Sequence, residues 1–141
     1  MSGIVPLLRA IIGITMTLRA SCMLHAACCM LHVACCMSSF TIAGSAIGVT
    51  ANKYKRWHKV FWDNFETSVK LHNIKKLIVI NHRDCGAAKI INGKKEFSDI
   101  NETKVHKSSF KKIKKIFRKK YPKLSIELKI ISLNSKVETF K

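Results

Sequence analysis

Apolar side chains recur at intervals of three and four residues in two long stretches of the chain. This spacing predicts amphipathic helices over residues 57–72 and 103–121. Between them, residues 77–80 form a short apolar run rich in β-branched side chains, which is typical of a strand buried on both faces. A second strand is predicted over residues 125–133, where apolar positions first alternate and then continue without a break. A short helix is expected over residues 87–91.

The order of these elements indicates the fold class. Residues 40–49 read as a further strand that runs into a glycine-containing turn, so strands and helices alternate along the chain. A strand–helix–strand unit of this kind crosses over with a right hand and places its two strands in parallel. We therefore predict an α/β domain over residues 40–141, with a partial parallel sheet and flanking helices.

Residues 1–39 follow a different pattern. The segment Cys22–Cys28 is repeated almost unchanged in Cys29–Cys35, with a period of seven residues. On a helix, the His and Cys side chains of this repeat would share one face, where they could bind a soft metal ion. A tandem duplication without a selected site is the interpretation that we favour. We expect residues 1–39 to be an apolar Cys/His-repeat extension that is poorly ordered.

The segment 20–52 contains no Lys, Arg, Asp or Glu. It is long enough to span a bilayer, which needs about 20 apolar residues. A small protein that is associated with a membrane through residues 20–52 is therefore one alternative. Against it, the segment is diluted by His, Ser, Thr and Gly, and basic residues flank both of its ends.

Candidate chemistry lies directly after the predicted strand 77–80. His82 and Cys85 stand three residues apart, and Gly86 allows a tight turn into a helix. Binding sites in open α/β sheets lie outside the carboxyl ends of the strands. Neutral imidazole and thiolate are the usual nitrogen and sulfur ligands of Zn²⁺. We therefore predict that His82 and Cys85 are metal ligands and that the cofactor is Zn²⁺.

Asp84 lies between these two residues, and two interpretations are open for it. Its carboxylate could accept a hydrogen bond from a metal ligand or serve as an improvised third ligand. It could instead cap the N-terminus of the following helix, which we favour because Asp is a preferred N-cap residue.

The His-x-x-Cys-Gly sequence at residues 82–86, preceded by an apolar strand, resembles the second zinc motif of the β-class carbonic anhydrases. The resemblance covers residues 40–140 and corresponds to the second half of that family's domain, so it implies a truncated member. It also implies a zinc lyase that reversibly hydrates carbon dioxide to bicarbonate. A homodimer with its sites near the subunit interface is implied in the same way.

One part of the family's pattern is missing. The third zinc ligand of the family is the Cys of a Cys-x-Asp-x-Arg motif, and this chain contains no such motif. A catalytic zinc ion normally has three protein ligands and one exchangeable position. We therefore expect a degenerate carbonate dehydratase with low or no activity, and we assign no catalytic residue.

The charge of the chain supports another alternative. Its 26 basic and 8 acidic residues give a formal net charge of +18. Lysines gather in residues 111–123, opposite the apolar stripe of the predicted helix. Such an excess attracts polyanions without sequence specificity. The alternative is a basic module that binds nucleic acid, or another anionic surface, non-specifically.

The cysteines indicate the compartment. Five of the six lie between Cys22 and Cys36, and the sixth is Cys85. This distribution does not resemble a disulfide framework, so we expect a reducing compartment and predict a cytoplasmic protein. Membrane association through the N-terminal segment remains the alternative location.

Overall fold

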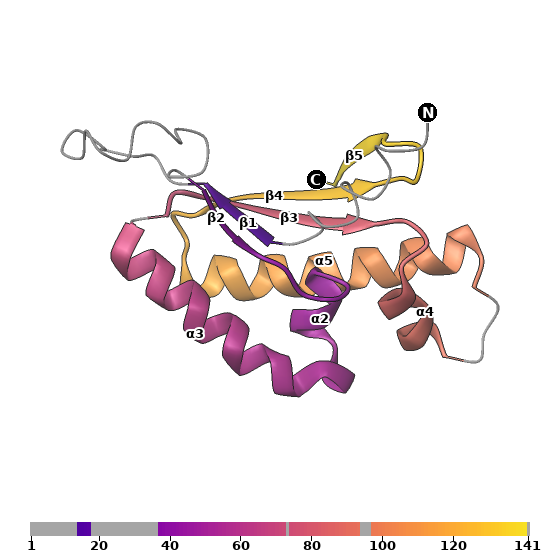
Figure 1. Ribbon diagram of the computed structural model, residues 1–141, viewed down its shortest axis with the longest axis horizontal. Coiled ribbons are helices and arrows are strands. Elements are labelled where there is room, and N and C mark those ends of the chain that lie inside the picture. Colours follow the sequence, from indigo (N-terminus) through magenta and orange to yellow (C-terminus); the bar gives the residue numbers. More distant parts are fainter. Residues whose placement is uncertain (1–13, 18–36, 73, 94–96, 141) are drawn as a thin grey trace, which may run out of the picture.

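The computed structural model describes residues 14–17, 37–72, 74–93 and 97–140 (Figure 1). The described elements are, in chain order, β1 (Ile14–Thr17), β2 (Met37–Phe40), α2 (Ala46–Thr50), η2 (Asn52–Tyr54), α3 (Lys55–His72), β3 (Lys76–His82), α4 (Gly86–Asn92), α5 (Asp99–Lys120), β4 (Ser125–Ile131) and β5 (Val137–Phe140). The Cys/His repeat at residues 22–35 lies outside the described residues.

The described strands form one sheet in the order β2-β1-β3-β4-β5. Strands β3 and β4 pair in parallel, with Leu77 opposite Ile126 and Val79 opposite Leu128. The other neighbouring pairs are antiparallel. The predicted α/β class and the parallel pairing across the α5 connection are therefore confirmed, although the sheet as a whole is mixed.

The described helices all lie on one face of this sheet (Figure 1). Burial along β3 alternates as a result: Leu77, Val79 and Asn81 are buried, whereas Ile78 and Ile80 are half-buried. The expectation that this strand is buried on both faces is wrong. Its inward side chains face the helices, and its outward side chains lie on the face that no described helix covers.

An aromatic cluster fills the space between the sheet and the long helices. Phe61 and Phe65 of α3 are fully buried, and Phe117 of α5 packs against Phe65 with 4.7 Å between ring centroids. Helix α5 starts at Asp99, four residues earlier than its apolar pattern predicts. Ser98 accounts for this, because its hydroxyl oxygen accepts a hydrogen bond from the Asn101 N–H at 3.4 Å.

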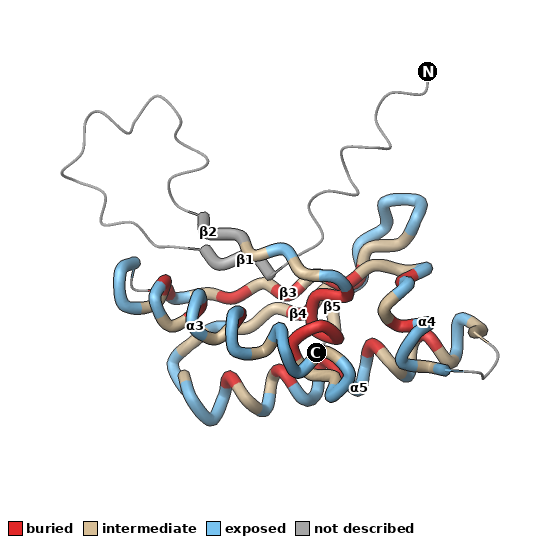
Figure 2. The backbone as a smooth tube through the Cα atoms, turned by 60° about the horizontal axis from the view of Figure 1, so that its bottom comes forward, coloured by how far each residue is buried: buried red, intermediate tan, exposed pale blue. Residues whose placement is uncertain are grey.

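Within residues 40–49, the expected strand ends already at Phe40. The expected glycine-containing turn is present at residues 43–45, but the helix that follows it was not predicted. The chain turns after Ile42 and enters α2, which is buried almost throughout (Figure 2). Gly44 makes the turn possible, because it adopts a φ of +73° and a Cβ there would lie only 2.6 Å from the Ala87 Cβ. Sequence alternation does not reveal such a close approach between distant backbone segments.

Two of the described strands, β1 and β2, fall within or next to residues 1–39, and β1 pairs with β3. Within the described part of the chain, no helix is both long and apolar enough to cross a membrane. Residues 20–36 of the membrane segment considered above, 20–52, lie outside that part.

Candidate metal site

The predicted metal ligands lie at the carboxyl end of the parallel strand pair. Strand β3 ends at His82, and α4 begins at Gly86, so only three residues connect them. The Arg83 N–H donates to the Ile131 carbonyl oxygen at 2.8 Å, which extends the pairing with β4 by one residue. This is the position at which open α/β sheets place their sites.

His82 is held in one tautomer by its own backbone. Its Nδ1 lies 2.8 Å from the Arg83 carbonyl oxygen. A carbonyl oxygen can only accept, so Nδ1 carries the hydrogen and the neutral ring keeps its lone pair on Nε2. Metal-binding histidines are oriented in this way by a hydrogen bond from their second ring nitrogen. The hydrogen bond with the Cys85 side chain is the main cause that raises the pKa of His82, against the effect of burial.

Cys85 is a free thiol with only 2% of its surface exposed. Burial by itself would raise the pKa of this thiol. The His82 side chain and the backbone N–H groups of Ala88 and Ala87 outweigh that effect, so the pKa is lowered from 9.0. The structure thus brings the two predicted ligands together, and their surroundings favour the thiolate, which is the form that binds metal.

A third ligand for this pair is not found among the described residues, where no group of three or more His, Cys, Asp or Glu side chains could hold a metal ion. His82 and Cys85 are the donor types that suit zinc, so they fit a two-ligand site. They do not fit a catalytic zinc centre, which needs three protein ligands.

Asp84 does not cap the following helix, so that expectation is wrong. Cys85 occupies the N-cap position of α4, and no side chain caps it there. Asp84 is exposed and has a φ of +55°, in the left-handed region that side-chain-bearing residues rarely adopt. Its proposed role beside the metal stays a prediction.

Sequence reasoning missed a buried polar group behind the pair. Asn81, Glu102 and His106 are each at most 3% exposed. Glu102 accepts a hydrogen bond from the Cys85 N–H, with 2.9 Å between N and Oε1. The sequence contains an indication that two of these residues are buried. Glu102 and His106 are four residues apart and continue the buried stripe of α5.

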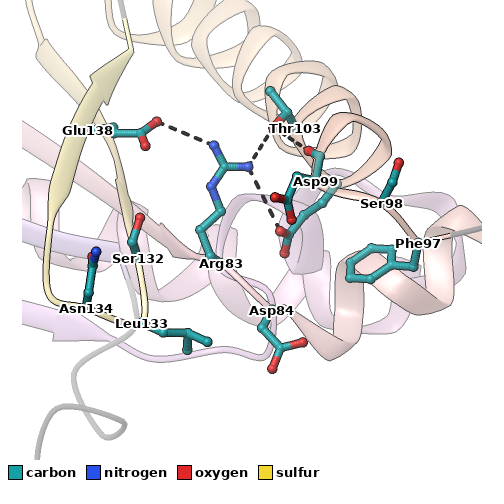
Figure 3. Close-up of a pocket in the computed structure, with 11 residues that line it drawn as sticks. Arg83, Asp84, Phe97, Ser98, Asp99, Thr103, Ser132, Leu133, Asn134 and Glu138 are labelled. Atoms are coloured by element: carbon teal, nitrogen blue, oxygen red, sulfur yellow. Dashed lines mark hydrogen bonds and ion pairs between the residues drawn. The ribbon is translucent and has the colours of Figure 1, made fainter.

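A pocket of about 530 Å³ adjoins the site (Figure 3). Arg83 points into it, and its guanidinium contacts Thr103 Oγ1 at 2.6 Å and Glu138 Oε2 at 3.4 Å. The charged residues of the lining are one base and four acids: Arg83, Asp84, Asp99, Glu102 and Glu138. Neither His82 nor Cys85 lines this pocket. Its excess of negative charge disfavours an anion such as bicarbonate.

Comparisons with known proteins give relatives without an assigned activity. The chain is 31% identical over 99 residues to the uncharacterized protein RC0076 of Rickettsia conorii, and equally to an uncharacterized protein of Rickettsia bellii. The matched region is 70% of this chain but only 53% and 60% of those two proteins, so the chain spans little more than half of their length. No family model and no solved structure matches the chain.

Proposed function

We propose that this chain is a zinc-binding protein of carbonic-anhydrase-like ancestry, with low or no ability to hydrate carbon dioxide. The observation that carries the proposal is the arrangement of His82 and Cys85. Nδ1 of the imidazole is bound to the Arg83 carbonyl oxygen, which leaves Nε2 as the atom that could bind a metal, beside a buried thiol whose pKa is lowered. This arrangement follows a parallel strand, as it does in the motif that residues 82–86 resemble.

The same site argues against efficient catalysis. Zinc, when bound with three ligands in a shaped cavity, lowers the pKa of its water to about 7 and so supplies hydroxide. Here the pair provides two ligands, and the sequence lacks the Asp and Arg of the family's first motif. The neighbouring pocket is acidic, and Arg83 is already paired within it. These features support zinc binding without a working hydration site.

Native mass spectrometry of the full chain with added zinc tests the proposal. We expect at most about one zinc ion per chain, held by His82 and Cys85. The Cys85→Ser variant should lose it. The matched control replaces the cysteines of the repeat region by serine, namely Cys22, Cys28, Cys29, Cys35 and Cys36, and should keep it. Unchanged zinc content in Cys85→Ser would show that the assignment is wrong.

The resemblance also supports a homodimer, and the cysteine distribution supports the cytoplasm as the compartment. Light scattering on the purified full chain tests the dimer, because a mass equal to one chain at micromolar concentration would contradict it.

A second candidate function is supported by the surface of α5. Its exposed basic residues are Lys104, Lys107, Lys111, Lys112, Lys115, Arg118, Lys119 and Lys120. No acidic residue follows Glu102 in this helix. We propose that this surface gives salt-sensitive, sequence-independent binding to nucleic acids or other polyanions, because charge alone supports it.

Titration of two unrelated DNA duplexes at two salt concentrations tests this surface. Binding should weaken steeply with salt and should not differ between the duplexes. Replacing Lys111 and Lys115 by Gln should weaken binding to both duplexes alike, whereas replacing Lys136, in the β4–β5 turn, should have a smaller effect. Discrimination between the duplexes that persists at high salt would contradict the proposal and indicate a specific binding module.

A further inference from the structure

We propose that Glu102 is the positioning residue of the metal pair. Its buried carboxylate holds the backbone N–H of Cys85 and thereby fixes the direction of the Cys85 side chain toward His82. The inference rests on the zinc site proposed above. It adds a residue from α5 that lies outside the His-x-x-Cys-Gly sequence.

The turn that carries Cys85 needs an external support. Asp84 is held in the left-handed region, which costs roughly 1 kcal/mol or more for a residue other than glycine. Helix α4 has only seven residues, and no side chain caps it at Cys85. The Cys85 carbonyl accepts the first helical hydrogen bond, from Lys89 N at 2.9 Å. The Cys85 N–H is directed the other way, to Glu102 Oε1, also at 2.9 Å.

Two further polar groups lie close to the Glu102 carboxylate. Its side chain is 4% exposed, with Arg83 Nη1 at 4.0 Å from Oε2 and His106 Nε2 at 3.5 Å from Oε1. Arg83 is in turn held by Thr103 at 2.6 Å. A buried carboxylate with these neighbours is oriented before any metal arrives, since leaving it unpaired would be costly. It therefore acts as a rigid acceptor for the Cys85 N–H.

The chemistry of this contact suggests three informative substitutions. Glu102→Gln removes the charge but keeps an oxygen that can accept the Cys85 N–H. Glu102→Leu has a similar size and no acceptor. Glu102→Asp keeps the charge but withdraws the oxygen by one methylene. If the hydrogen bond positions Cys85, zinc affinity should depend on whether residue 102 places an acceptor oxygen within hydrogen-bond distance of the Cys85 N–H. It should not depend on whether residue 102 carries a negative charge.

The experiment is a competition titration of the full chain against a chromophoric zinc chelator. We expect Glu102→Gln to bind zinc within about threefold of the wild type. We expect Glu102→Leu to weaken zinc binding by about 10- to 100-fold, the usual loss when a residue that orients a metal ligand is removed. Glu102→Asp should fall between these two. Ile113→Val, a core change on the same helix, is the control for a general loss of stability and should leave zinc affinity unchanged.

Amide hydrogen exchange of Cys85 in the metal-free protein gives a second readout. The amide should be protected in the wild type and in Glu102→Gln, and it should lose protection in Glu102→Leu. Equal zinc affinity and equal Cys85 protection in Glu102→Leu would overturn the inference. If Glu102→Leu does not fold, the ranking of the other two variants decides, because tighter binding by Glu102→Asp than by Glu102→Gln would also overturn it.

Failure of the proposed function gives a different result. A wild-type chain that binds no zinc would refute the metal site, while the exchange of the Cys85 amide would still report whether Glu102 positions the turn. Loss of protection in Glu102→Leu alone would then support the positioning, and unchanged protection would overturn it.

Discussion

Asn81 at the end of β3 and His106 in α5 share a buried hydrogen bond, with 2.8 Å between Nδ2 and Nδ1. An amide nitrogen can only donate, so His106 Nδ1 accepts and its ring hydrogen lies on Nε2, which is buried 3.5 Å from Glu102 Oε1 without forming a hydrogen bond to it. The Asn81 Oδ1 atom accepts from the Ala46 N–H at 3.1 Å. One side chain therefore connects α2, β3 and α5.

Substituting Asn81 should destabilise the fold. In Asn81→Leu, the Ala46 N–H and His106 Nδ1 lose their buried partner, and we expect a loss of about 2–4 kcal/mol, since each unsatisfied group costs about 1–3 kcal/mol. Urea unfolding followed by circular dichroism measures it. The control is Lys112→Ala on the exposed face of α5, which should change stability by less than about 0.5 kcal/mol. A loss in Asn81→Leu as small as that of the control would contradict the argument.

His106 should make stability depend on pH. Burial lowers its pKa from the ordinary value of 6.5, and Arg83 and His82 act in the same direction, while the nearby Glu102 carboxylate only partly opposes them. In the unfolded chain, His106 binds a proton near pH 6.5, whereas in the folded chain it binds that proton only at a lower pH. The free energy of unfolding should therefore fall as pH decreases below about 6.5. The decrease in the free energy of unfolding should end once the pH lies below the pKa of His106 in the folded chain.

Urea midpoints of the wild type and of His106→Gln between pH 7.5 and 5 test this. The wild type should lose up to about 1.4 kcal/mol per pH unit more than the variant within that window. The raised pKa of His82 acts in the opposite direction, but it is common to both proteins and largely cancels in the difference. Parallel curves for the two proteins would show that His106 is not the responsible group.

Asp84 offers a test of backbone strain between His82 and Cys85. Its φ of +55° suits glycine better than any residue with a Cβ, so Asp84→Gly should be neutral or stabilise by up to about 1 kcal/mol. Asp84→Val should destabilise by more than about 1 kcal/mol, because a β-branched side chain makes this backbone conformation less favourable. Thermal unfolding of both variants measures the difference. Equal stability of the two would contradict the left-handed conformation at this position.

The sequence allowed the prediction of the elements whose periodicity is local. Strand β3 is apolar and β-branched, and α5 repeats its apolar positions every three or four residues, so both were predicted, together with the parallel pairing of β3 and β4. The burial of β3 on both faces was not correct, because it depends on which face the helices cover. No pattern within a single strand contains that information.

The candidate site was predictable only where its residues adjoin in sequence. His82 and Cys85 were found from their spacing after β3. Glu102 lies 17 positions from Cys85, and His106 lies 25 positions from Asn81, so these contacts exist only once α5 packs on the sheet. The cap predicted at Asp84 failed because the chain turns there through the left-handed region and makes Cys85 the N-cap residue.

Catalysis gives the last prediction. Zinc-loaded protein should hydrate carbon dioxide no faster than buffer containing the same amount of free zinc. Among the described residues, no third donor completes the pair of His82 and Cys85, and the acidic pocket beside them disfavours bicarbonate. A two-ligand ion also lacks the fixed geometry and dry cavity on which metal catalysis depends. Stopped-flow measurement with a pH indicator decides the matter, with metal-free protein as the control. A rate well above free zinc that His82→Ala abolishes would refute the predicted inactivity, and it would require a third ligand from the repeat cysteines or from a second chain.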